Sequence, residues 1–109
     1  MKTRMITRHC EISRSLQIRA NELLDKLDRF DPRITETVVT FDEQKHVRRV
    51  DAMVKVVGDE PVVAHAEAED FREALDTLAA RLTKILRRRR SQLVSRRGPK
   101  LSEAMANPE

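Results

Sequence analysis

The basic side chains of segment 81–100 are the residues of this sequence whose type and spacing most clearly indicate a binding chemistry. The segment, RLTKILRRRRSQLVSRRGPK, holds nine Lys or Arg residues and no acidic residue. Residues 1–80 hold thirteen basic and sixteen acidic residues, so the net charge of +4 conceals a mildly acidic body joined to a strongly basic segment. Because concentrated like charge repels itself, such a segment usually has a polyanion as its partner.

Two predicted helices each place basic residues along one side, and we expect the two sets to form ridges with a groove between them. The later set begins with an i, i+3, i+7 spacing, which keeps its members on one side of a helix. Arginine suits RNA because its planar guanidinium binds a phosphate with two hydrogen bonds and stacks on bases. The residues of this predicted RNA-binding surface are Arg19, Lys26 and Arg29 on the first helix and Arg81, Lys84, Arg87, Arg88 and Arg90 on the second.

The basic run has a second, purely structural interpretation as the solvated end of a helix. Cations near a helix C-terminus are stabilised by the helix dipole, and Arg is a good helix former. Two features favour RNA binding instead. The run continues past the predicted helix through Arg96, Arg97 and Lys100, and no acidic residue interrupts it. A solvated structural helix more often mixes the two signs in i, i+4 pairs.

Other kinds of site have weaker support in the sequence. The three histidines and Cys10 lack the spacing of metal ligands, so we predict neither a metal site nor a cofactor. Glu67, Glu69 and Asp70 are typical of the wet face of a strand followed by a helix cap. A glycine-rich phosphate loop and a nucleophile motif are both absent from the sequence. We therefore predict that the protein is not an enzyme.

Two amphipathic helices must position the basic residues. Apolar residues recur at three- and four-residue steps over 13–29 and 71–93. Ser13 and Asp70 stand where N-caps should stand, because their side chains can accept a hydrogen bond from a first-turn amide. Pro32 predicts the end of the first helix, since proline disfavours helical geometry in the residue before it.

Four strands are predicted between and before these helices. The clearest are two segments that alternate apolar and polar residues, which is typical of a sheet with one wet face. The first strand–helix–strand unit should be a right-handed crossover, and the rest an antiparallel meander. The predicted fold is an α/β chain of the two-layer α+β kind, β-α-β-β-β-α, with both helices on one face of a four-stranded sheet. The predicted strands are 3–9, 34–42, 46–57 and 62–69.

Length and composition predict one domain over residues 1–95 and a flexible tail over 96–109. A single cysteine fits a reducing compartment. Apolar runs stay well short of the roughly 20 residues that span a bilayer, so no membrane association is predicted. The first residues, MKTRMITRH, lack the apolar core of a signal peptide. We expect a cytoplasmic protein that is a monomer in solution.

Four segments, taken in order, resemble one protein family. Residues 6–13, ITRHCEIS, are similar to the family's opening, and residues 25–27 to the end of its first helix. Residues 66–76 resemble the entry into its second helix, and residues 81–87 its basic helix. The family is that of the bacterial ribosome hibernation factors, the short hibernation-promoting and ribosome-associated inhibitor proteins of the sigma-54 modulation type. The resemblance covers residues 3–94.

The resemblance implies a fold close to that of double-stranded-RNA-binding domains and a partner, the small ribosomal subunit with its rRNA. It implies binding in the channel between head and body, where the protein would overlap the tRNA sites and the mRNA path. The family's glycine after the Ile–Thr pair is missing here, so the first turn must be built differently. Positions that match the family's rRNA-contacting basic residues are Lys26, Arg81, Lys84, Arg87, Arg88 and Arg90.

The expected function is therefore that of a ribosome hibernation factor, a stress or stationary-phase inhibitor that blocks translation by occupancy. One alternative is a general double-stranded-RNA or nucleoid binding module. Another is a protein-interaction module that uses the exposed sheet face with Arg49, Asp51 and Lys55. Segment 96–109 is too short to hold the dimerisation domain of long-form relatives. Whether the protein promotes or opposes ribosome pairing stays open.

Overall fold

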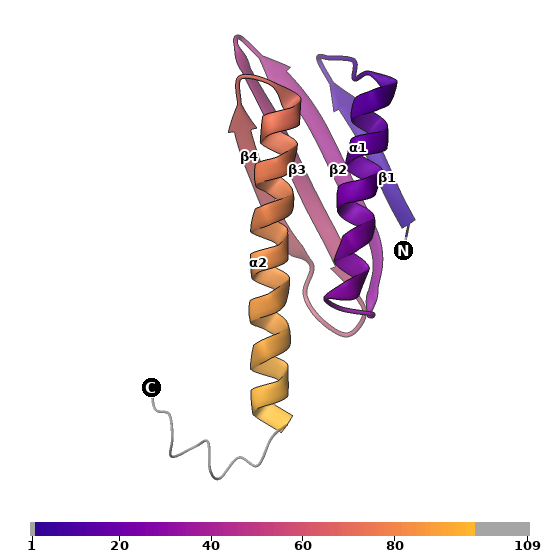
Figure 1. Ribbon diagram of the computed structural model, residues 1–109, viewed down its shortest axis with the longest axis vertical. Coiled ribbons are helices and arrows are strands. Elements are labelled where there is room, and N and C mark those ends of the chain that lie inside the picture. Colours follow the sequence, from indigo (N-terminus) through magenta and orange to yellow (C-terminus); the bar gives the residue numbers. More distant parts are fainter. Residues whose placement is uncertain (1, 98–109) are drawn as a thin grey trace.

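A computed structural model describes residues 2–97 of the chain, with side chains as far as residue 92. Its elements follow the predicted order, and α2 projects past the end of the sheet (Figure 1). Of the predicted tail, 96–109, residues 96 and 97 belong to α2, and residues 98–109 lie outside the described residues. The elements are β1 (Lys2–Arg8), α1 (Arg14–Asp25), the 3₁₀ turn η1 (Lys26–Arg29), β2 (Ile34–Gln44), β3 (Val47–Val56), β4 (Val62–Ala68) and α2 (Phe71–Arg97).

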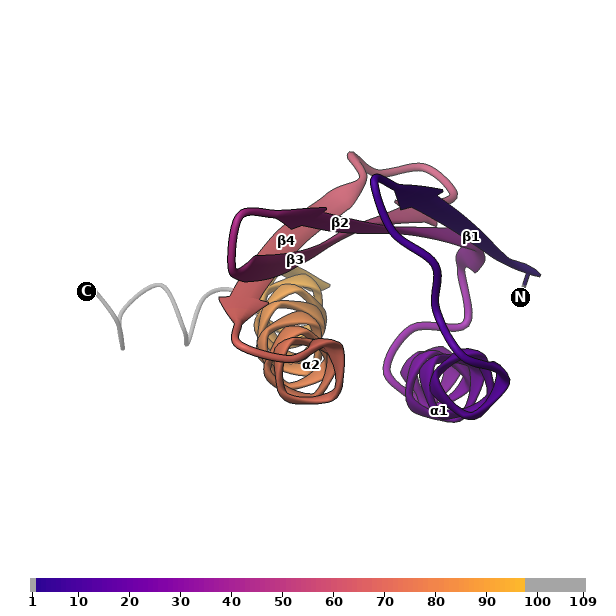
Figure 2. The ribbon, with the colours of Figure 1, turned by 90° about the horizontal axis from the view of Figure 1, so that it is seen from above.

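The four strands form one sheet in the order β1-β2-β3-β4. Strand β1 pairs with β2 in parallel, and the β2–β3 and β3–β4 pairs are antiparallel. Both helices cover the same face of the sheet (Figure 2). The predicted two-layer α+β fold, with a parallel first pair and an antiparallel meander, is confirmed.

The helices begin at the predicted caps. The Ser13 hydroxyl oxygen accepts a hydrogen bond from the Leu16 backbone N–H at 3.1 Å. The Asp70 carboxylate accepts one from the Glu73 backbone N–H at 2.8 Å. Each cap satisfies an amide that the first turn of a helix would otherwise leave without a partner.

The core lies between the sheet and the helices, and α2 contributes most of its helical side. Val50, Ala52 and Val54 of β3 point into it, as their alternation predicts. The Phe41 ring on β2 meets the Phe71 ring edge-on, with centroids 5.5 Å apart. The fully buried side chains of α2 are Ala74, Leu75, Leu78, Leu82 and Leu86. The depth of this packing fixes the rotation of α2, and hence the direction of its basic residues.

The first helix ends differently from the prediction. Sequence periodicity predicts one helix over 13–29, whereas α1 stops at Asp25 and a 3₁₀ turn follows. The Phe30 N–H bonds to the Leu27 carbonyl at 2.9 Å, the i to i+3 pattern of a tightened turn before Pro32. Side chains at i and i+3 eclipse in a 3₁₀ turn, so Lys26 and Arg29 align on one side.

The second helix is longer than predicted and reaches Arg97 rather than residue 93. Arginine favours helix, and α2 continues to the residue before Gly98-Pro99. The turn after β1 is built with His9 in the left-handed region at φ 56°. The His9 ring Nδ1 lies 3.1 Å from an Asp42 carboxylate oxygen, which holds this turn against β2.

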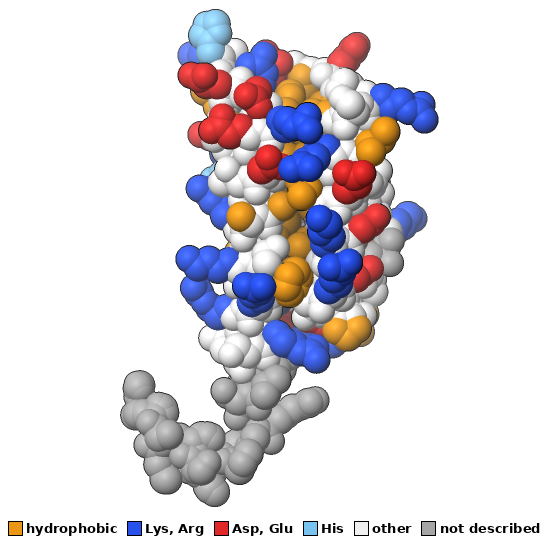
Figure 3. Space-filling model, viewed as in Figure 1, with side chains coloured by type: hydrophobic (Ala, Val, Ile, Leu, Met, Phe, Trp, Pro, Cys, Tyr) orange, Lys and Arg blue, Asp and Glu red, His pale blue; other side chains and the backbone are white. Residues whose placement is uncertain are grey.

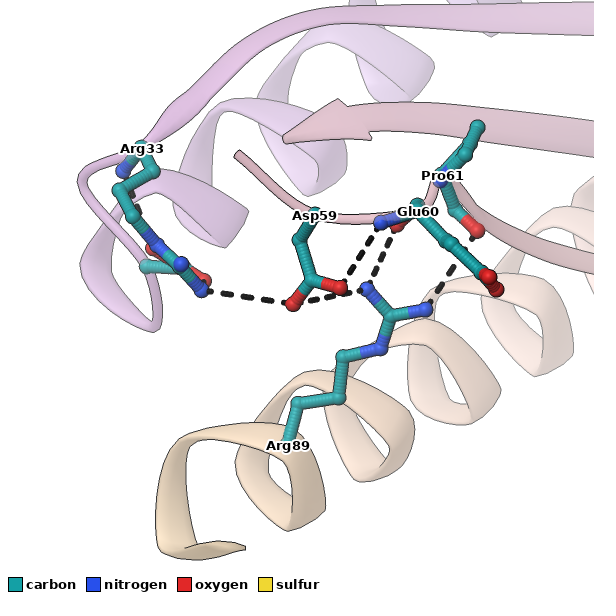
Figure 4. A network of polar contacts seen from close by, with 6 residues as sticks. Arg33, Asp59, Glu60, Pro61 and Arg89 are labelled. Atoms are coloured by element: carbon teal, nitrogen blue, oxygen red, sulfur yellow. Dashed lines mark hydrogen bonds and ion pairs between the residues drawn. The ribbon is translucent and has the colours of Figure 1, made fainter. Parts of the chain in front are cut away.

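A polar network ties the C-terminal half of α2 to the turn between β3 and β4 (Figure 4). Arg89 donates to the carbonyl oxygens of Glu60 at 2.7 Å and Pro61 at 3.5 Å. Its guanidinium also lies 3.5 Å from the Asp59 carboxylate, which is 3.8 Å from Arg33. Arg89 therefore has a structural role, although the sequence places it in the middle of the basic run.

Asp31, next to this network, is buried and bound to Arg33. The Arg33 guanidinium donates to both Asp31 carboxylate oxygens at 3.0 and 2.8 Å. These hydrogen bonds are the main reason why the pKa of Asp31 lies below its usual 3.8, and the charge of Arg90 adds to the effect. Because folding lowers this pKa, the ionised carboxylate stabilises the folded state. The full stabilisation is present above the unfolded-state pKa, and it is lost as the pH falls through the folded-state pKa.

We therefore expect Asp31→Asn to lower the free energy of unfolding at neutral pH by about 1–3 kcal/mol. The difference from wild type should shrink as the pH falls below about 4, because wild-type Asp31 then takes up a proton and loses the same ion pair. Urea unfolding of both chains across this pH range measures it. A difference that stays constant down to low pH would show that the Asp31–Arg33 pair contributes nothing through its charge.

Candidate nucleic-acid interface

An open groove of about 510 Å³ runs between α1 with η1 and α2. Its floor is largely apolar and its rim is basic, and Figure 3 shows Lys and Arg side chains on both sides of an apolar strip on the helical face. The groove that two ridges should enclose is therefore present. Its lining residues are Arg19, Leu23, Lys26, Arg29, Phe30, Asp76, Ala79, Ala80 and Thr83.

One end of the groove gathers basic residues from both helices. Lys26 and Arg29 are exposed on its rim. From the other side, the Arg87 guanidinium lies 5.4 Å from the centre of the Phe30 ring, within cation–π distance. Asp31 follows Phe30 in the chain, and its pKa is lowered mainly by the hydrogen bonds from Arg33. The nearby charge of Arg90 adds a smaller contribution to this lowering. Four of the eight predicted residues thus meet around the junction of η1 and α2.

Arg19 also lines the groove, but it is engaged with an acid. Its guanidinium lies 3.1 Å from the Asp76 carboxylate and so joins α1 to α2. Its Nε is buried with no hydrogen-bond partner. The ion pair reduces the positive charge that Arg19 can present, so Arg19 adds less to the cationic field of the groove than Lys26 or Arg29.

The remaining predicted residues lie on the other side of α2. Arg81, Lys84 and Arg88 line a second depression of about 410 Å³ beside β4, together with Val63 and Ile85. Arg81 donates a hydrogen bond to the His65 carbonyl oxygen at 2.6 Å, which holds its guanidinium over the edge of β4. We call these three basic residues the β4 flank. The eight predicted residues therefore form two neighbouring surfaces on either side of α2 rather than one groove.

Several residues of the groove were not singled out from the sequence. Phe30, Ala79, Ala80 and Thr83 form its floor, and Asp76 its acidic end. Ala79 and Ala80 lie next to the leucine stripe of α2. They are a weak sequence signal for a groove, because small side chains leave room between two helices. Arg96, Arg97 and Lys100 lie beyond the side chains that the structure describes.

The open face of the sheet carries charges that neutralise one another. Arg49 lies 3.0 Å from Asp51 and 3.4 Å from Glu67, and the hydrogen bonds that its guanidinium donates to the Asp51 carboxylate raise the pKa of Arg49. Lys55 lies 3.1 Å from Glu36, and its hydrogen bond lowers the pKa of that carboxyl. This face therefore offers a polyanion much less than the helical face does.

Residues 2–97 contain no group of three or more His, Cys, Asp or Glu side chains that could hold a metal ion. Cys10 packs against the core, with its Sγ 3.5 Å from the Phe41 carbonyl oxygen, and burial raises the pKa of its thiol. Among the described residues, no helix has both the length and the apolar character required to cross a membrane.

Comparison with known proteins points in one direction. A model of the family described as sigma 54 modulation protein / S30EA ribosomal protein matches residues 3–94. The chain is 29% identical over 92 residues to the ribosome hibernation promoting factor of Pseudomonas putida, covering 84% of this chain and 89% of that protein. It is 31% identical over 86 residues to the protein of the same name from Azotobacter vinelandii, covering 79% of each.

Solved structures agree with the fold. A ribosomal subunit interface protein from Coxiella burnetii superposes with a TM-score of 0.78 and 25% identity, covering 84% of this chain and 99% of that one. The N-terminal domain of Thermus thermophilus Protein Y gives a TM-score of 0.70 at 23% identity, covering 78% of this chain and 93% of that one. At that identity, the second comparison supports the fold alone.

Proposed function

The chain belongs to the sigma 54 modulation protein / S30EA ribosomal protein family, and from this premise we propose that it is a ribosome hibernation factor that binds rRNA of the small ribosomal subunit through its helical face. The relatives named ribosome hibernation promoting factor match it over most of their length, which supports carrying that role over. With a ribosome as its partner, the protein is expected in the cytoplasm.

The observation that carries the proposal is the asymmetry between the two faces of the domain. The helical face holds exposed Lys26, Arg29 and Arg87 around a groove, whereas Arg49 and Lys55 at the centre of the open sheet face lie against acids. A surface with uncompensated positive charge attracts phosphates, and binding releases the counterions that RNA holds. Because Arg49 and Lys55 are paired with acids, the sheet face attracts RNA less than the helical face does.

Inhibition would require no chemistry. The domain would occupy the decoding channel between head and body of the small subunit as a rigid monomer, and its volume would exclude tRNA and mRNA. Shape would select the site more than base sequence does, because phosphate contacts position a protein without reading bases. The two-layer packing, with Leu78 and Leu82 fully buried, supplies the required rigidity.

The test is co-sedimentation with purified small subunits at increasing salt. Because each phosphate contact adds about one unit to the slope of log affinity against log salt, a surface of several cations should lose at least about tenfold in affinity between about 50 and 200 mM salt. Binding that does not respond to salt would contradict the proposal.

Competition separates ribosome binding from general duplex binding. An excess of double-stranded RNA of random sequence should leave most of the protein on the small subunit, because the channel adds shape complementarity that a free duplex lacks. If the duplex strips the protein from the subunits in proportion to its concentration of phosphate, the chain is a general double-stranded-RNA-binding module.

A further inference from the structure

The floor of the groove has a chemistry that phosphate contacts alone do not explain. Leu23, Phe30, Ala79 and Ala80 present apolar surface between basic residues, on the face proposed to meet RNA. A surface that held only phosphates would gain nothing from apolar side chains at its centre. An apolar hollow rimmed by polar groups usually marks a binding site.

The basic end of the groove suits a nucleotide. The Arg87 guanidinium lies 5.4 Å from the centre of the Phe30 ring, so a planar cation stands next to the aromatic ring that lines this end of the groove. Aromatic rings and guanidinium planes are the groups on which unpaired bases stack. Lys26 and Arg29, aligned by the 3₁₀ turn, lie on the adjoining rim where a phosphate would sit.

The opposite end of the groove has the other sign. Asp76, held at 3.1 Å by Arg19, would repel a phosphate and accept a hydrogen bond from an amino group on a base or from a ribose hydroxyl. The Thr83 hydroxyl lies between the two ends along α2 and can donate or accept. This polarity would orient a nucleotide with its phosphate toward η1 and its base toward the apolar floor.

We propose that the groove between α1 and α2 holds one unpaired nucleotide of the RNA, with its base against Phe30 and the apolar floor of the groove and its phosphate against Lys26 and Arg29. The groove volume of about 510 Å³ is within the range of small-ligand sites. This inference rests on the proposed function and deepens it, because it gives the helical face a preference for a bulged or looped RNA over a continuous duplex.

The probe is an RNA hairpin with a single bulged 2-aminopurine, compared with the same stem fully paired. Wild type should bind the bulged hairpin about tenfold more tightly, since stacking of one base contributes about 1–3 kcal/mol. The fluorescence of the 2-aminopurine should change on binding because the base enters an apolar site. Equal affinity for the two hairpins would overturn the inference. The apolar floor of the groove would then have to bind another partner, such as a peptide.

Ala80→Leu fills the groove without altering a charge and at an exposed position where the fold should tolerate it. It should abolish the preference for the bulge and leave the salt dependence of binding unchanged, because the phosphate contacts remain. Asn21→Leu is the matched control, since it adds the same side chain to an exposed site on α1 outside the groove lining. Preference retained in Ala80→Leu would contradict the proposed site.

Co-sedimentation of the same variants separates this inference from the function on which it rests. If wild type binds small subunits and Ala80→Leu binds equally well, the nucleotide site is wrong and the hibernation proposal stands. If wild type fails to bind small subunits at low salt, the hibernation proposal itself is wrong. Circular dichroism and urea unfolding of Ala80→Leu verify that its fold is intact.

Discussion

Replacing Lys26, Arg29 and Arg87 together by glutamine should weaken binding to the small ribosomal subunit by at least about a hundredfold, because a hydrogen bond to a charged group contributes about 1.5–3 kcal/mol. These three side chains surround the basic end of the groove and come from both helical elements. Glutamine keeps a polar side chain of similar length and is a good helix former, so the variant should fold. The slope of log affinity against log salt should fall by about three.

The control removes the same charge from the other side of the domain. Lys2, Arg8 and Lys45 are exposed on β1 and on the turn between β2 and β3. Their replacement by glutamine lowers the net charge equally, so it measures the effect of overall charge alone. If the two triple variants lose the same affinity, attraction is a property of the whole molecule and the groove has no special role.

Reversing the charge of Lys84 and Arg88 should weaken binding by a comparable amount, about a hundredfold or more, if RNA extends across α2 onto the β4 flank. Glutamate at both positions changes the local charge by four units and sets carboxylates against phosphates. Arg81 is left intact because it donates a hydrogen bond to the His65 carbonyl oxygen, and its loss would remove a contact between α2 and β4. Small-subunit co-sedimentation at low salt measures the loss.

Lys2→Glu with Arg8→Glu is the matched reversal for the β4 flank, since both residues are exposed on β1, at the far edge of the sheet. It should weaken binding by much less. If Lys84→Glu with Arg88→Glu binds as well as wild type, the β4 flank faces away from the RNA. The interface would then be confined to the groove between the helices.

The elements of the fold could be predicted from the sequence because their signals are local. Val50, Ala52 and Val54 alternate with polar residues, and one face of β3 is accordingly buried. Ser13 and Asp70 cap their helices through the amides three residues later, a contact that depends on a few neighbouring residues. Local chemistry decides where such elements begin, so little tertiary information is needed.

The division of the basic residues between two surfaces could not be predicted. Helical spacing groups Arg81, Lys84 and Arg88 correctly, but it does not say on which side of α2 the first helix lies. That side is set by the rotation of α2 on the sheet, which follows from the burial of its leucines. The sequence-based expectation of one groove lined by both sets was therefore too simple.

The roles of individual arginines depend on partners distant in sequence. Arg89 binds the turn at residues 59–61, and Arg19 binds Asp76, 57 residues away. Within the run RRRR, nothing local distinguishes Arg89 from its neighbours. Arg89 thus anchors α2 to the β3–β4 turn, whereas its neighbour Arg88 belongs to the β4 flank and Arg87 lies over Phe30.

The most direct test is a cryo-electron microscopy map of the small ribosomal subunit with this protein bound. The account predicts density for the domain between head and body, with the groove between α1 and α2 against rRNA and the open sheet face turned away from the contact. Density at another place on the subunit, or an rRNA contact made by the sheet face with Arg49 and Lys55, would contradict it.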